Sequence, residues 1–379
     1  MTKGHPHGGF SEWGRLVPVN SISAQWGRAV PTPAGRRSLL LVTALTLLAC
    51  VVGAAGVPDA FTVNRSIGRG VNVGNALEAP VEGEWGVTIK EEYFDIIKAA
   101  RFDSVRIAVR WSSHAGETAP YSVDPKFFQR TDEVIGQALA RGLAVILTTH
   151  HYNELYQDPD WHRERFLAIW TQVARHYQDY RPALCFEPLN EPHENLDAPK
   201  WNRLIEDMLP MIRQSNPTRT VLLGPANYND IQQLEAFELP KGDRNIIVSI
   251  HYYLPYHFTH QGAHWAPGSD AWLGTEWKGL AAEKRAVERD LEVAAAWAKR
   301  NNRPICLSEF GANSKADMAS RARWTRCVAD TAVENKFSFT YWDFCAEFFG
   351  LYDLKTRSWH PELLDAVIPR SAPVPGAAR

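Results

Sequence analysis

Short apolar runs alternate with longer amphipathic stretches along most of the chain after residue 66. The apolar runs fall at 70–73, 104–109, 143–149, 183–189, 220–224, 246–250, 304–308 and 337–342. The run at 143–149 shows no polar alternation, which is typical of a strand that is covered on both faces. Between the runs, apolar residues recur at helical spacing, as at Val287, Leu291 and Ala294. This pattern predicts eight strand–helix units.

Eight such units predict an α/β fold, the (β/α)8 or TIM barrel, which needs roughly 250 to 300 residues. We expect this single catalytic domain to span residues 61–368. A doubly wound open sheet is the alternative, although it leaves the eighth unit unexplained. The last residues, 369–379, are rich in Pro and Ala, so we expect a flexible tail.

Residues 1–60 are expected to form a polar leader followed by an export segment. The arginine pair at 36–37 precedes an apolar run at 39–52, which has the length of a signal-sequence core and is short for a membrane span. Small residues follow at 53–56, as a cleavage site requires, and the arginine pair loosely resembles a twin-arginine signal. We therefore expect a secreted or periplasmic protein, with a lipoprotein at Cys50 or an uncleaved anchor as alternatives.

Composition and charge exclude several classes of function. Apolar residues make up 45% and charged residues 22%, which is ordinary globular composition, and a net charge of −2 gives no strong attraction to nucleic acid. Neither a glycine-rich nucleotide loop nor a Gly-x-Ser-x-Gly elbow is present. The cysteines after the leader lack the paired spacing of zinc sites, so buried free thiols are expected. The alternative is a disulfide bond from Cys327 to Cys306 or to Cys345. The fourth cysteine after the leader is Cys185.

Polar and aromatic side chains gather where the apolar runs stop, and in a parallel barrel these carboxyl ends carry the active site. In chain order they are Asn72, Arg106, Trp111, His150, Tyr152, Asn190, Glu191, Asn227, His251, Tyr253, Glu309 and Trp342. Burying so many polar groups without partners would be costly. We therefore expect them to line one open pocket.

Two of these residues, Glu191 and Glu309, suit the cleavage of a glycosidic bond. That reaction needs one carboxyl group to protonate the leaving oxygen and another to attack the anomeric carbon or to activate water. Arg106 could keep one carboxylate ionised, while partial desolvation and the facing charge would raise the pKa of the other. The Asn-Glu-Pro motif at 190–192 is weak alone, because Asn and Pro also mark turns.

A metal site has less support. His257, His260 and His264 have helical spacing, but Pro and Gly residues around them argue against a helix, and no carboxylate is close in sequence. Neighbouring strand residues point to opposite faces, so only one of His150 and His151 can enter the pocket. We expect neither a metal nor another cofactor.

The ordered set of strand-end residues resembles glycoside hydrolase family 5, the cellulases and related β-glycanases of the retaining (β/α)8 clan. The resemblance covers about residues 66–367 and rests on Arg106, His150, Asn190-Glu191-Pro192, His251, Tyr253, Glu309 and Trp342. The segment 258–263 also looks like bacterial endoglucanase-like members. Ser308 stands where many members have Gly, a small departure next to Glu309.

The resemblance implies a role for each matched residue. Glu191 would be the acid/base and Glu309 the nucleophile of a double displacement. Arg106 and Tyr253 would bind and orient the nucleophile, and Trp342 would form the platform beneath the sugar. The remaining three residues would support that sugar and the acid/base; they are His150, Asn190 and His251.

The resemblance further implies an endo-β-1,4-glucanase that acts on a β-glucan polysaccharide as a monomer, without a protein or nucleic-acid partner. A β-mannanase or another β-glycanase of the same family is the alternative, because one axial hydroxyl changes only a few hydrogen bonds. A carbohydrate-binding barrel without catalysis is a third hypothesis. It is disfavoured because both carboxyl groups are present.

Overall fold

The computed structural model describes residues 58–150 and 152–370. The predicted export segment, His151 and the residues after 370 lie outside the described part. Within that part, no helix combines the length and apolar composition needed to cross a bilayer.

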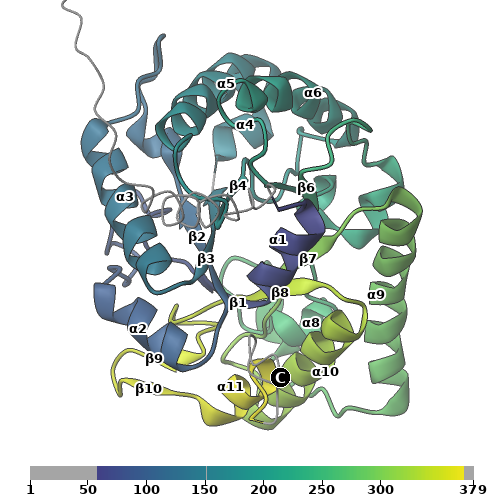
Figure 1. Cartoon of the computed structure of the whole chain (residues 1–379). Coiled ribbons are helices and arrows are strands. Elements are labelled where there is room, and N and C mark those ends of the chain that lie inside the picture. The colour runs from purple at the N-terminus through teal and green to yellow at the C-terminus, as the bar shows by residue number, and fades with distance from the viewer. Residues whose placement is uncertain (1–57, 151, 371–379) are drawn as a thin grey trace, which may run out of the picture. The chain divides into compact units, whose positions relative to one another are not determined.

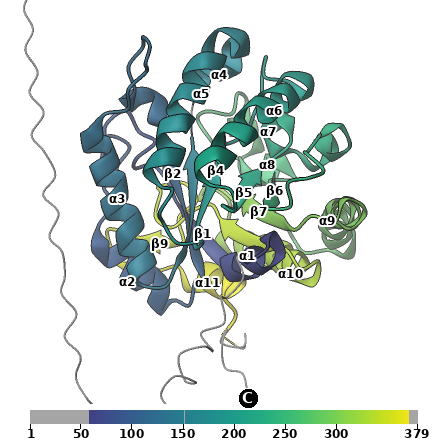
Figure 2. The ribbon, with the colours of Figure 1, turned by 45° about the horizontal axis from the view of Figure 1, so that its top comes forward.

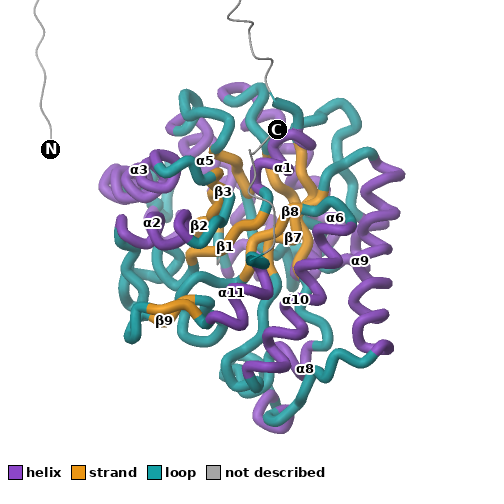
Figure 3. The backbone as a smooth tube through the Cα atoms, turned by 60° about the horizontal axis from the view of Figure 1, so that its bottom comes forward, coloured by secondary structure: helices purple, strands orange, loops and turns teal. Residues whose placement is uncertain are grey.

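Eight parallel strands close into a barrel in the order of the sequence, and the last strand pairs with the first. The strands are β1 Arg69–Val73, β2 Ser104–Val109, β3 Ala144–Thr149, β4 Leu184–Glu187, β5 Val221–Leu223, β6 Ile246–His251, β7 Ile305–Glu309 and β8 Ser338–Tyr341. The predicted TIM barrel is confirmed, and the open sheet is excluded because β1 and β8 are hydrogen-bonded. The strands lie inside a layer of helices (Figure 3).

Helices surround the barrel, and α3, α5, α6 and α9 lie on its outside in two different views (Figures 1 and 2). The long helices are α2 Glu91–Ala99, α3 Pro125–Ala140, α5 Pro159–His176, α6 Ala198–Ser215, α9 Ala281–Asn301 and α10 Met318–Glu334. Helices α3, α5, α6 and α10 begin after aspartates whose side chains accept a backbone N–H of the first turn, namely Asp124, Asp158, Asp197 and Asp317. Such caps satisfy donors that have no partner within the helix.

Shorter elements occupy the connections. They are η1 Trp111–His114, α4 Asn153–Gln157, α7 Ala226–Asn229, η2 Ile231–Ala236, α8 Tyr256–Thr259, η3 Ser269–Trp272 and α11 Pro361–Val367, with a two-stranded sheet of β9 Tyr352–Asp353 and β10 Ser358–Trp359. Several of these follow β5 and β6, so the longest irregular connections lie at the carboxyl end of the barrel. A barrel enzyme carries its site on such loops.

The amino-terminal end of the barrel is covered by α1 Ala60–Ile67, a helix that the strand–helix pattern did not predict. Its apolar face packs against Ile146, Leu222 and Ile247 from three strands, together with buried Cys185 and Cys306. All four described cysteines are free, which supports the expectation of buried thiols over a bridge. Helix α1 therefore fills and closes the barrel interior at this end.

Candidate active site

Glu309 ends β7, and two side chains from other strands hold its carboxylate. Arg106 of β2 donates from Nη1 to Oε1 of Glu309 at 2.7 Å, and the Tyr253 hydroxyl donates to Oε2 at 3.0 Å. Only 6% of the Glu309 side chain is exposed. Both contacts favour the ionised form, which a nucleophile requires.

Arg106 lies fully buried beneath the site and is held from several sides. Its guanidinium donates to Oδ1 of Asn72 at 2.8 Å and to Oδ1 of Asn190 at 2.6 Å. The amide nitrogen of Asn72 donates to the backbone carbonyl groups of β7 and β8, and the residue is fully buried. Asn72 therefore positions Arg106, which is a supporting role.

Glu187 is a third carboxylate of the site that sequence reasoning missed. It ends β4, is completely buried, and its Oε2 accepts from Nε of Arg106 at 2.5 Å. Its other oxygen accepts from the Ser249 hydroxyl at 2.8 Å. A charged residue inside an apolar strand run was the available signal, because such a residue needs a buried partner. One guanidinium thus bridges Glu187 and Glu309.

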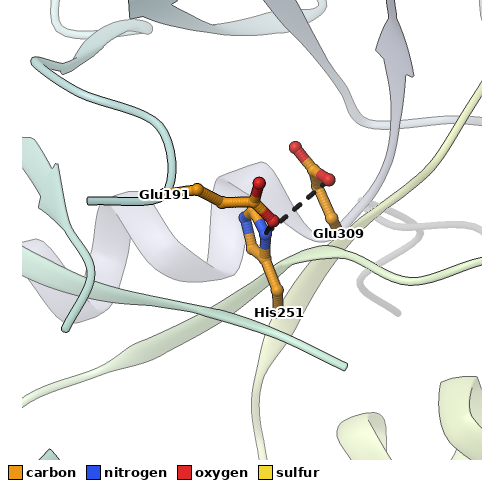
Figure 4. Close-up of side chains that lie close together, drawn as sticks. All are labelled: Glu191, His251 and Glu309. Carbon is orange, nitrogen blue, oxygen red and sulfur yellow. Dashed lines mark hydrogen bonds and ion pairs between the residues drawn. The ribbon is translucent and has the colours of Figure 1, made fainter. Parts of the chain in front are cut away.

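Glu191 follows β4 with a left-handed backbone (φ 47°), and its side chain points towards His251 and Glu309. Its Oε1 lies 2.6 Å from Nδ1 of His251, and the same Nδ1 lies 3.6 Å from Oε2 of Glu309. Figure 4 shows the carboxyl groups of Glu191 and Glu309 close to one another and to the His251 ring. One ligand atom from each residue lies within 4.8 Å of the others.

Burial makes both carboxyl groups harder to ionise. Desolvation raises the pKa of Glu191 to about 7, although Arg106 and His193 oppose the shift. Desolvation also raises the pKa of Glu309, against the lowering effects of His251 and Arg106. Burial lowers the pKa of His251 to about 4, so the imidazole is neutral at neutral pH. Glu191 can therefore keep a proton up to near neutral pH.

The floor of the site is formed by rings from opposite strands. His150, after β3, stacks on Trp342, after β8, with ring centroids 5.4 Å apart and planes 16° apart. The side-chain amide nitrogen of Asn190 lies 3.4 Å from Nε2 of His150, and the backbone carbonyl oxygen of Asn190 accepts from the Tyr156 hydroxyl at 2.6 Å. The flat Trp342 indole, which is partly exposed, has the form of a sugar platform.

A cleft of about 690 Å³ opens beside Glu191 between the loops that follow β5 and β6. Its walls carry the exposed aromatic residues Tyr228, Tyr256 and Trp265, and Asn227 lies at its edge. The aromatic walls suit the apolar faces of sugars. A larger cavity of about 770 Å³ lies beside α1 at the other end of the barrel and contains none of the candidate residues.

Two candidates from the sequence lie elsewhere. Trp111 is fully buried and packs edge-on against Phe127 of α3 at 5.4 Å. Tyr152 is also buried, and its hydroxyl accepts from Arg165 of α5 at 2.9 Å. Neither side chain lines the cleft beside Glu191, because the chain turns into the helical layer directly after β2 and β3.

Comparison with known proteins is consistent with this geometry. The pattern of the family described as Cellulase (glycosyl hydrolase family 5) matches residues 68–348. The chain belongs to glycoside hydrolase family 5. The predicted family is therefore confirmed, and the solved family members that follow share the same barrel.

Among solved family 5 structures, Cel5A of Thermotoga maritima with mannotriose is 49% identical, covers 82% of this chain and 100% of that one, and has a TM-score of 0.80. The same enzyme with cellobiose gives the same values. The cellulose synthase subunit CcsZ of Clostridioides difficile is 38% identical, covers 80% of this chain and 99% of that one, and has a TM-score of 0.77.

Among curated relatives, Endoglucanase H of Acetivibrio thermocellus is 35% identical over 82% of this chain. The match covers only 33% of that relative's own length, so the chain spans about a third of it. The prediction of a family 5 glycoside hydrolase related to endoglucanases is confirmed by these findings.

Proposed function

We propose that this protein is a retaining endo-β-1,4-glucanase, with Glu309 as nucleophile and Glu191 as acid/base. The closeness of the two carboxyl groups carries the proposal, because one oxygen atom of Glu191 and one of Glu309 lie within 4.8 Å of one another. Retaining glycosidases hold their carboxyl groups about 5 to 5.5 Å apart, whereas inverting enzymes leave about 6.5 to 9.5 Å for a water molecule. The names of the endoglucanase relatives support β-1,4-glucan as the substrate.

In the first step, Glu309 attacks the anomeric carbon, and the bond from that carbon to the leaving oxygen breaks. Glu191 gives its proton to this oxygen as the leaving chain departs. In the second step, Glu191 takes a proton from water, the resulting oxygen attacks the anomeric carbon, and the Glu309 carboxylate is released. Arg106 and Tyr253 hold Glu309 ionised before the first step and receive its charge again after the second.

A second candidate substrate is β-mannan. It is favoured by the mannotriose complex of Thermotoga maritima Cel5A, which is 49% identical to this chain. Glucose and mannose differ in one hydroxyl at carbon 2, so one site can accept both when few hydrogen bonds reach that position.

The test is hydrolysis of carboxymethylcellulose, mannan and xylan by the full chain, measured as new reducing ends. We expect cleavage of the glucan, with the product anomer retained when the reaction is followed by NMR. Glu309→Gln should lower kcat by about four orders of magnitude or more, as the loss of a nucleophile does in other hydrolases. It should remain folded, because Arg106 keeps its contacts with Glu187, Asn72 and Asn190. Inverted product, or full activity of the variant, would refute the assignment.

We also propose that the protein acts outside the cytoplasm, as the arginine pair and the apolar run at 39–52 indicate. A polysaccharide substrate is itself extracellular, which supports the same interpretation. Glucanase activity confined to the cytoplasmic fraction of expressing cells would contradict it.

A further inference from the structure

Asn229 is a buried polar residue that the mechanism above does not use. It ends α7, and none of it is exposed. Its Nδ2 lies 3.2 Å from Nε2 of His251 and 3.4 Å from Oγ of Ser249. On the other side of the same ring, Nδ1 of His251 contacts Oε1 of Glu191. Asn229 therefore contacts the imidazole on the side opposite the acid/base.

The backbone around Asn229 is built for this contact. Asn227, Tyr228 and Asn229 have φ angles of 57°, 66° and 56°, three left-handed residues in a row. This conformation is uncommon for residues other than glycine, and it persists only where the surroundings enforce it. Gly224 leaves the necessary space, because a β-carbon there would collide with the Asn229 amide group. These features together turn one amide inwards beneath the cleft.

The direction of the hydrogen bonds starts from Glu187. A carboxylate that is paired with Arg106 can only accept, so the Ser249 hydroxyl donates to it. The oxygen of Ser249 then acts only as an acceptor: it accepts from the Ser308 hydroxyl at 2.5 Å and keeps a second lone pair for another donor. It therefore takes a hydrogen bond from the NH2 group of Asn229, which fixes the orientation of this amide.

The same NH2 group faces His251 with its second hydrogen, so Nε2 of the ring must accept. A neutral imidazole that accepts at Nε2 carries its proton on Nδ1. His251 then donates this proton to Oε1 of Glu191. With the opposite tautomer, Nδ1 would instead accept the proton of Glu191 and hold it away from the leaving oxygen.

We propose that Asn229 is a positioning residue that fixes the tautomer of His251, so that the acidic proton of Glu191 resides on Oε2. Oε1 accepts from His251, and Oε2 is the oxygen that protonates the leaving group. The inference rests on the proposed function, because it assigns the acid step of that reaction to one oxygen atom. The charged groups around the ring are Glu191, Glu309, Arg106 and Glu187.

Asn229→Asp tests the proposal, because the new side chain has the same shape and, in its ionised form, offers only acceptors. It should reverse the ring, which would then donate from Nε2 and withdraw its proton from Glu191. We compare kcat/KM for carboxymethylcellulose, which needs an acid, with that for 2,4-dinitrophenyl β-cellobioside, whose leaving group departs without a proton. We expect a fall of about 100-fold on the polymer and less than tenfold on the aryl glycoside, since acid catalysis contributes about 10² to 10⁴.

Two further variants separate this role from a structural one. Asn313→Asp places the same change at another fully buried asparagine, whose side chain accepts from the backbone of Lys315, and it should leave the ratio of the two activities unchanged. Ser249→Ala removes the acceptor that orients Asn229 and should shift the ratio in the same direction by a few-fold. Cooperative thermal unfolding of Asn313→Asp and Ser249→Ala would show that both variants are folded.

An equal loss on both substrates in Asn229→Asp and Ser249→Ala, or no loss at all, would overturn the positioning role while leaving the proposed function intact. If the wild-type chain itself hydrolyses neither glucan nor the aryl cellobioside, the proposed function fails and this inference fails with it. A bias against the polymer in both variants, absent from Asn313→Asp, is the result expected from a fixed tautomer.

Discussion

Replacing Tyr253 by phenylalanine removes a single hydroxyl group from the candidate nucleophile. The ring keeps its packing, since it contacts His260 edge-on at 5.0 Å and Phe349 at 6.2 Å. The lost interaction is the hydrogen bond to Oε2 of Glu309 at 3.0 Å. The change is therefore local to the charge on Glu309.

The size of the effect follows from the chemistry of that bond. A hydrogen bond to a charged group contributes about 1.5 to 3 kcal/mol, and about 1.4 kcal/mol corresponds to one pH unit. Without the Tyr253 hydroxyl, the ionised form of Glu309 loses this stabilisation. The pKa of Glu309 should then rise, and the acidic limb of kcat/KM should move upwards by about one to two pH units. Arg106 remains in place, so the enzyme stays active near neutral pH.

The measurement is kcat/KM between pH 3 and 9 with a soluble chromogenic cellobioside. Tyr252→Phe is the matched control, because the neighbouring tyrosine also donates to a carboxylate, Asp290, at 3.0 Å. That variant should leave the acidic limb where it is in the wild type. An unmoved limb in Tyr253→Phe, or equal movement in both variants, would refute the reasoning that this hydroxyl stabilises the charged nucleophile.

Three further outcomes are expected. The basic limb of kcat/KM on carboxymethylcellulose should lie near pH 7. Burial raises the pKa of Glu191 to about 7, so this residue loses its acidic proton as the pH rises through that value. Full activity at pH 9 would contradict this expectation. Tyr228→Ala should lower kcat/KM on the polymer about threefold to tenfold. The variant removes from the cleft wall a half-exposed ring that stacks on His193 at 4.4 Å. Hydrolysis of an aryl cellobioside should change less, and an equal loss on both substrates would argue against sugar contact. EDTA should leave activity unchanged. The carboxylate oxygen atoms of Glu191 and Glu309 already accept hydrogen bonds from His251, Arg106 and Tyr253. Inhibition by EDTA that added metal reverses would show a required cation.

Much of the fold could be predicted from the sequence because strands and helices differ in their local apolar period. The run at 104–109 matches β2 at both ends, and the apolar residues expected at helical spacing, Val287, Leu291 and Ala294, form the buried face of α9. The barrel rule then placed Glu191 and Glu309 at one end, since parallel strands in a closed sheet end on the same side. Helix α1 escaped prediction because it precedes the first strand and belongs to no strand–helix unit.

What the sequence by itself determined is which residues stand at the ends of buried strands, since apolar period and strand length are local properties. Only the tertiary structure decided which of these side chains meet. Trp111 and Tyr152 are buried in the helical layer, and the Asn72 side chain accepts a hydrogen bond from Arg106.

Glu187 and Asn229 show the same division most clearly. Glu187 is a charged residue inside an apolar run, and Asn229 is an amide in a turn. The residues near each of them in sequence do not indicate which side chain it bonds to. Their partners come from β2 and β6, which lie far away along the chain and next to them in space. Because a buried polar group is defined by the partner that satisfies it, such a role becomes visible only when the closed barrel brings the strands together.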